Sequence, residues 1–80
     1  MANKVYVSVL ALWEADGRLF PKEFTWEDGR VFVIDRVLDA RARVSLKAGG
    51  GGVRYTCRVQ GKEMHLFFDD YEFRWFVEGK

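Results

Sequence analysis

The sequence predicts an all-β protein, either a small six-stranded antiparallel barrel of SH3-like type or a strongly bent sheet, built as a meander of hairpins. Short runs of β-branched and aromatic residues alternate with polar residues along most of the chain. Glycine-centred turn motifs separate these runs at close spacing, which is typical of small barrels. With 80 residues, we expect one domain over 1–80.

The stretch from Phe24 to Ile34 carries the strongest hairpin motif, Asp28-Gly29, between two runs of alternating apolar residues. A two-residue loop would place Glu27 opposite Arg30. A three-residue loop, with Gly29 in a left-handed bulge, would place Trp26 opposite Arg30. We favour the three-residue loop because burial stabilises in proportion to apolar area, and this loop gathers the larger side chains on one face; they are Phe24, Trp26, Phe32 and Ile34.

The first strand is expected over Lys4 to Trp13, and it is apolar on both of its alternating faces. This pattern suits a central strand, or a strand whose second face meets a partner. A turn at 14–17 leads into a second strand from about Arg18 to Trp26. Pro21 lacks an N–H group, so we expect this strand to lie at an edge or to bulge there.

The turn sequence Trp-Glu-Ala-Asp-Gly-Arg at residues 13–18 is echoed by Trp-Glu-Asp-Gly-Arg at residues 26–30. The echo is too short to indicate a duplication, and the same hairpin chemistry used twice is the simpler interpretation.

A third strand is expected from Arg30 through Leu38, and it could continue because apolar and polar residues alternate from Leu38 to Lys47. Alanine, arginine and leucine also favour helix, so one helical turn near 39–45 is the alternative. The glycines at 49–52 lose much backbone entropy on ordering. We therefore expect a flexible glycine-rich loop at about 47–52.

The last strands are expected at Val53 to Val59, Lys62 to Phe68 and Phe73 to Glu78. A two-residue loop at Gln60-Gly61 would pair Cys57 with Met64, and it assembles one coherent apolar face. This register puts His65 opposite Thr56, on the other face of the sheet.

Composition limits the function classes. Seven Phe, three Trp and three Tyr are too many rings for so small a core, so we expect some of them at an interface or groove. The net charge of +1 is not that of a typical nucleic-acid binder. One cysteine forbids an internal disulfide and fits a reducing cytoplasm. No apolar run approaches the ~20 residues that span a membrane, so we expect no membrane partner.

Two constellations could carry chemistry. Cys57 and His65 are the only thiol and imidazole, but the expected register separates them, so we predict no catalytic dyad. Asp69, Asp70 and Glu72 could ligate a metal, although acidic turns are commonly just solvated. We therefore expect no enzymatic activity, no catalytic residues, no metal and no cofactor.

The basic segment from Arg36 to Lys62 has seven basic residues and one acid, a net charge of +6, whereas the rest of the chain is at −5. As strand residues, its arginines would point away from the core and could present a positive strip to phosphates. Polar residues are also ordinary at outward strand positions. The candidate nucleic-acid-binding residues are Arg41, Arg43, Lys47, Arg54 and Arg58.

Several motifs spread over most of the chain resemble a group of short, uncharacterised bacterial proteins found chiefly in Gram-positive lineages. They are Pro-Lys-Glu-Phe-Thr-Trp at 21–26, Asp-Gly-Arg at 28–30, Ile-Asp at 34–35, Val-Leu-Asp at 37–39, Arg-Tyr-Thr-Cys-Arg-Val at 54–59 and Trp-Phe-Val at 75–77. The chain is more loosely similar to small proteins encoded beside DNA-damage polymerases. The resemblance implies a compact bacterial β domain and carries over no functional residues.

The function we expect is a non-enzymatic binding or adaptor domain whose target is a protein or a second copy of this chain. The excess of aromatic residues and the doubly apolar first strand favour it. The alternative is a nucleic-acid-binding barrel that uses the arginine strip, so DNA or RNA is the second expected class of partner.

Overall fold

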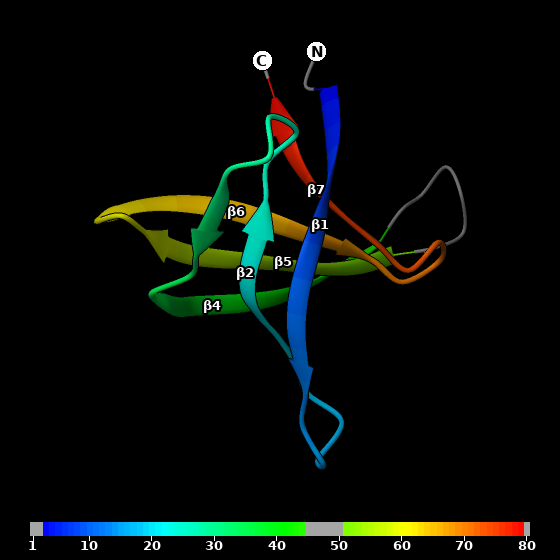
Figure 1. The fold of residues 1–80 in the computed structure, drawn as a ribbon. Coiled ribbons are helices and arrows are strands. Elements are labelled where there is room, and N and C mark those ends of the chain that lie inside the picture. Colours follow the sequence, from blue (N-terminus) through cyan, green and yellow to red (C-terminus); the bar gives the residue numbers. More distant parts are fainter. Residues whose placement is uncertain (1–2, 45–50, 80) are drawn as a thin grey trace.

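The computed structural model describes residues 3–44 and 51–79, which form seven antiparallel strands in one sheet of order β3-β2-β1-β7-β6-β5-β4 (Figure 1). The predicted all-β class and strongly bent sheet are therefore confirmed. The described residues contain no helix, and thus none that could cross a membrane. The strands are β1 (Asn3–Trp13), β2 (Leu19–Thr25), β3 (Val31–Val33), β4 (Arg36–Val44), β5 (Gly51–Val59), β6 (Lys62–Asp69) and β7 (Arg74–Gly79).

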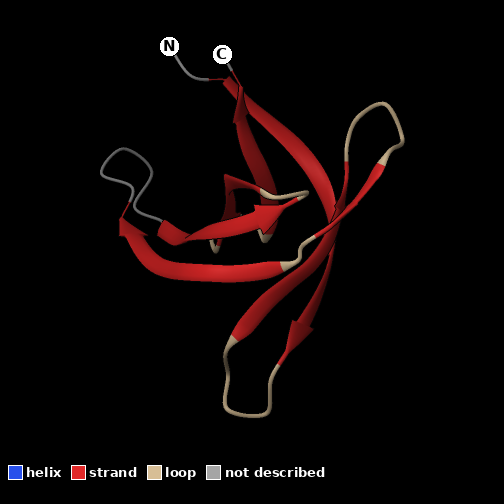
Figure 2. Ribbon diagram, turned by 90° about the vertical axis from the view of Figure 1, so that its left-hand side faces the viewer, coloured by secondary structure: helices blue, strands red, loops and turns tan. Residues whose placement is uncertain are grey.

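The sheet curls into a half-barrel that does not close (Figure 2). β1 is an interior strand, with β2 paired to its second half and β7 paired to its first half. In Figure 1, β4, β5 and β6 run roughly horizontally, whereas β1 and β2 run vertically. This bend gives the sheet a concave inner face and a convex outer face.

The number of strands differs from the six that the sequence predicts. The backbone leaves β2 and joins β5 between Val33 and Arg36: Ile34 N donates to Lys22 O at 2.9 Å, and Asp35 N donates to Arg58 O at 2.9 Å. The expected third strand is therefore divided into β3 and β4, which lie at opposite edges of the sheet.

The segment at 39–44 is extended and pairs with β5, so the alternative of a helical turn is wrong for these residues. Leu38 forms a bulge between Val37 and Asp39, which interrupts the alternation that the sequence shows. Residues 45–50, which include Lys47 and most of the expected flexible loop, lie outside the described residues.

Gly51 and Gly52, the last residues of that expected loop, are the first residues of β5. A Cβ atom on Gly52 would lie 1.8 Å from the carbonyl oxygen of Phe68, and one on Gly51 would lie 2.3 Å from that of Arg43. No other residue type fits this close approach of three backbones without a shift. The end of the glycine run is therefore part of the sheet.

Both N-terminal hairpins use a three-residue loop. Trp26 N donates to Arg30 O at 2.8 Å, and Glu14 N donates to Arg18 O at 2.7 Å. Gly17 and Gly29 each have a φ of +92°, as the predicted left-handed bulge requires. The favoured register of the second hairpin is confirmed, with Phe24 opposite Phe32 and their rings stacked at 5.3 Å.

The two loops also share their polar contacts, which confirms the interpretation of one hairpin chemistry used twice. The aspartate of each loop accepts the main-chain N–H of the arginine two residues later at 3.0 Å. This hydrogen bond holds the pKa of Asp16 and of Asp28 below the ordinary value. Each arginine then lies over the phenylalanine two residues further on, Arg18 over Phe20 and Arg30 over Phe32.

Pro21 is accommodated by a bulge, one of the two alternatives predicted for it; the other was a position at the sheet edge. Ala11 pairs with Pro21 and Leu10 pairs with Glu23, so Lys22 has no partner on β1. At the other end of the chain, the predicted Gln60-Gly61 hairpin is confirmed, with Cys57 opposite Met64 and Thr56 opposite His65.

The core lies on the concave face. Its buried members come from β2, β5, β6 and the link between β3 and β4. Cys57 and Leu66 are completely buried. The buried cluster comprises Phe24, Ile34, Tyr55, Cys57, Val59, Leu66 and Phe68.

Burial also sets the acid–base chemistry of this core, since it raises the pKa of the Cys57 thiol to about 11 from an ordinary value of 9.0. The unfolded chain deprotonates first, so the stability that this group contributes is complete below pH 9 and is lost as the pH rises through 11. At ~1.4 kcal/mol per pKa unit, the loss is on the order of 2–3 kcal/mol.

We predict that the free energy of unfolding, measured by urea titration from pH 8 to 11, falls more steeply in the wild type than in Cys57→Ala. The variant is less stable at pH 8 because it leaves a cavity, but it lacks the thiol's share of the slope, so the two stabilities converge as the pH rises. Equal slopes for the two proteins would contradict a buried, protonated thiol.

Candidate binding groove and basic face

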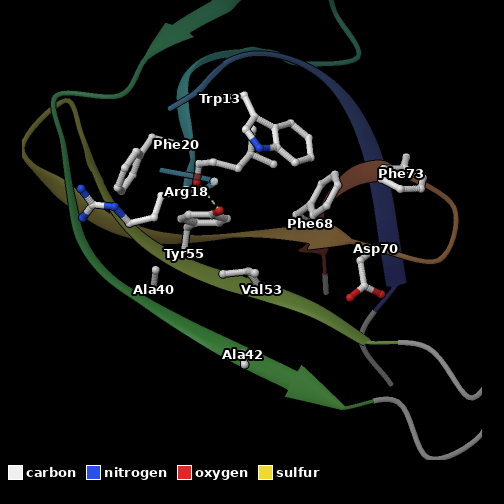
Figure 3. Close-up of a pocket in the computed structure, with 12 residues that line it drawn as sticks. Trp13, Arg18, Phe20, Ala40, Ala42, Val53, Tyr55, Phe68, Asp70 and Phe73 are labelled. Atoms are coloured by element: carbon white, nitrogen blue, oxygen red, sulfur yellow. Dashed lines mark hydrogen bonds between the residues drawn. The ribbon is translucent and has the colours of Figure 1, made fainter. Parts of the chain in front are cut away.

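The concave face is incompletely filled, and the open part forms a groove of about 440 Å³ (Figure 3). We call it the apolar groove. Its floor is made of Val53 and Tyr55 from β5 and Phe68 from β6, and its two long walls come from opposite ends of the sheet. The lining residues are Trp13, Gly17, Arg18, Leu19, Phe20, Ala40, Ala42, Val53, Tyr55, Phe68, Asp70 and Phe73.

One wall of the apolar groove consists of the end of β1, the turn that follows it and the start of β2. It presents Trp13, which is 61% exposed, and Phe20. The other wall is β4, which presents only Ala40 and Ala42. Because both β4 residues are small, they leave the space that the larger aromatic side chains opposite do not fill (Figure 3).

The floor is closely packed and largely aromatic. The Tyr55 ring lies 5.5 Å from that of Trp75, and the Phe68 ring lies 4.9 Å from Trp75. Tyr55 and Phe68 are 3% and 7% exposed. At one end of the groove Phe73, 68% exposed, packs edge-on against Phe68 at 6.0 Å.

One hydrogen bond crosses the floor: the Tyr55 hydroxyl donates to the main-chain oxygen of Leu19 (Figure 3). Burial, and to a smaller extent the neighbouring Cys57, raises the pKa of Tyr55. The phenol therefore keeps its proton and stays a donor at neutral pH. This bond joins β5 to β2 across the open side of the half-barrel.

The convex face has a different chemistry. A second hollow of about 410 Å³ lies there, lined mainly by polar groups. Three of the candidate arginines, Arg41, Arg43 and Arg54, line it together with His65 and Glu78. We call these three residues the arginine cluster.

The ladder places like charges opposite one another in this region. Arg41 pairs across the strands with Arg54, and Arg36 pairs with Arg58. Like charges in directly opposed positions destabilise a sheet. Asp39 offsets part of this at an ion-pair distance of 2.8 Å from Arg41.

Arg58 lies on the same face as the arginine cluster but does not line its hollow, and it is opposite Glu63 in β6. Lys47 lies outside the described residues. The structure thus brings together three of the five candidate residues and places the fourth further along β5.

The sequence pattern did not reveal that aromatic rings lie beneath the arginine cluster. The Arg43 guanidinium is 4.7 Å from the ring centre of Phe67 and 5.8 Å from that of Phe76, and the two rings stack at 5.0 Å. They are only 5% and 1% exposed. The cations cover them, so these rings offer no open face on which a base could stack.

The residues considered for chemistry are separated or hold the local backbone. Cys57 faces the core and His65 the convex face, which separates the pair as predicted. An Oδ1 atom of Asp69 accepts the main-chain N–H groups of Tyr71 and Glu72 at 2.8 and 3.3 Å.

Comparisons of this chain with protein-family models, with curated proteins and with solved structures gave no match.

Proposed function

We propose that this protein is a non-enzymatic protein-binding module, an adaptor whose apolar groove takes a segment of another protein. The observation that carries the proposal is an open groove with a buried, largely aromatic floor and two large rings, Trp13 and Phe73, more than 60% exposed at its margin. Clustered aromatic side chains beside a preformed apolar hollow are the usual centre of a binding site. The single buried thiol and the resemblance to bacterial proteins support a bacterial, cytoplasmic setting.

The energetic reason is the cost of leaving this surface in water. Trp13 and Phe73 lie on either side of a floor that is already buried, so a side chain entering the groove removes apolar area on three sides. Each ~100 Å² of apolar area so covered contributes about 2.5 kcal/mol before the costs of association. Preorganisation of the floor by Tyr55 and Phe68 keeps those costs low.

We predict that random peptides displayed on phage are enriched by the wild-type chain, and that Ala42→Trp weakens the enriched peptides by at least about tenfold. The tryptophan fills the groove from an exposed strand position, so the fold remains. The matched control is Glu63→Trp, also exposed and away from the groove, which should bind as the wild type does.

Failure to enrich any peptide, or equal binding by Ala42→Trp, would contradict the proposed function. Size-exclusion chromatography of both variants belongs to the same experiment. If the wild type is an oligomer that Ala42→Trp dissociates, the partner segment belongs to a second copy of this chain.

The arginine cluster supports a second candidate function, binding of a nucleic-acid backbone. The specific observation is the pair of opposed like charges, Arg41 with Arg54 and Arg36 with Arg58, next to an Arg54 Nε that is buried without a hydrogen-bond partner in the described residues. A polyanion would relieve the repulsion between these arginines. The covered rings of Phe67 and Phe76 favour contact with phosphates over stacking on bases.

We predict for this second function that binding of single- and double-stranded DNA, followed by fluorescence anisotropy, weakens about 20- to 40-fold between 50 and 200 mM salt if three phosphates are neutralised. Arg43→Ala should reduce both the affinity and the salt dependence, whereas Arg18→Ala, on the concave side, should change neither. No binding at low salt would end this candidate.

A further inference from the structure

The groove wall formed by β4 ends in a free sheet edge. β4 pairs with β5 along one side, and no strand pairs with its other side among residues 3–44 and 51–79. β3, the strand at the opposite edge, pairs only with residues 23–25 of β2. The start of β2 and β4 both line the apolar groove, and no strand pairing joins the two.

We propose that an extended segment of a partner protein adds to the free edge of β4 as an extra strand, with apolar side chains in the groove and acidic side chains on the convex face. This inference rests on the proposed function and specifies its binding mode and its ligand class.

The backbone of β4 provides the first argument. An edge strand of nine residues presents a row of N–H and C=O groups that pair readily with another extended chain. Most of this strand is exposed, from Ala40 to Val44. β2 offers much less on its side of the groove, because Pro21 has no N–H group and the Leu19 carbonyl already accepts from Tyr55. β4 is therefore the edge that supplies the main-chain hydrogen bonds.

The side chains of β4 provide the second argument. Ala40 and Ala42 face the groove, so an added strand would set its own inward residues beside two small neighbours and against Trp13 and Phe20. A hollow of 440 Å³ corresponds to roughly 15 waters at ~30 Å³ each, and its lining is mostly apolar. Leucine-sized side chains at alternate positions would fill it.

Charge decides the outward residues of the added strand. Arg41 and Arg43 are on the convex side of β4, where they would sit beside every second residue of the new strand. Arg18 stands at the mouth of the groove on the opposite wall. β4 itself has three arginines and one aspartate, a net charge of +2, so pairing with the β4 of a second copy brings like charge to like charge. An acidic segment is the complementary occupant.

The test uses a seven-residue peptide in which glutamate and leucine alternate, with a lysine–leucine peptide as the control. Titrations of the full chain followed by NMR should show at least about tenfold tighter binding of the acidic peptide. Arg41→Glu should abolish this preference. Lys62→Glu, a charge change of equal size at an exposed position of β6, should leave it in place.

Two N-methylated versions of the acidic peptide test the strand geometry. Methylation of one alternate set of amides removes the bonds to β4 and should cost at least about tenfold, while methylation of the other set should cost less than about threefold. The bound peptide should also protect from hydrogen exchange those β4 amides whose N–H groups point to the free edge, away from β5.

The outcomes separate the two proposals. Strand addition would be overturned if the two methylations had equal effects or if the β4 amides stayed unprotected. It would also be overturned if the acidic peptide did not bind while the phage-selected peptides still required an open groove. Each of these results would leave the proposed binding module standing. β4 amides that become protected with rising protein concentration, without peptide, would assign the edge to a second copy and also overturn it. If no peptide of either source binds, both proposals fail.

Discussion

A hydrogen bond from the Tyr55 hydroxyl to the Leu19 carbonyl holds the shape of this molecule, because it ties β5 to β2 where no strand pairing does so. The sheet curls far enough to bring these strands within reach of one side chain but not of each other's backbones. The bond lies over the core beside the Phe68 and Trp75 rings, where weak competition from water strengthens it. The opening that it spans is the apolar groove.

The curl also divides the charges of the chain between two faces. The concave face holds the core and the groove, while the convex face carries the arginine cluster over two stacked phenylalanines. The cations there serve as the cover of a second, smaller apolar layer, since the Arg43 guanidinium lies against Phe67. Gly52 lies opposite Arg43 on β5, and because it has no side chain it leaves room for the Arg43 side chain to lie over these rings. The arginines thus have a packing role whether or not they meet a phosphate.

Most of the fold followed from local rules. The Asp-Gly loops, the Gln60-Gly61 hairpin and the face shared by Cys57 and Met64 all depend on turn chemistry and on the period of two, which short stretches of sequence contain. The division of the third strand did not follow, because it depends on contacts between residues distant in sequence: the Ile34 N–H still bonds to Lys22 of β2, whereas the Asp35 N–H bonds to Arg58 of β5. No glycine or proline marks that break, which falls at the consecutive polar residues Asp35 and Arg36.

The candidate site was predictable only in part. The surplus of aromatic residues indicated a groove or interface, but the residues that form it come from both ends of the sheet and from the 70–73 turn. Ala40 and Ala42 looked like ordinary strand residues, and their importance as the low wall appears only when Trp13 and Phe20 stand opposite. The positions of the arginines were predicted by the period of two, whereas the rings beneath them required the register of β6 against β7.

The central claim is that the half-barrel is open along β4, and hydrogen exchange of the free monomer tests it most directly. At a concentration where the chain is monomeric, alternate amides of residues 39–44 should be protected by pairing with β5, and the intervening amides should exchange at rates close to those of an unstructured chain. Protection of every amide along this strand in the monomer would contradict the account, since it would mean that the barrel closes and the groove does not exist.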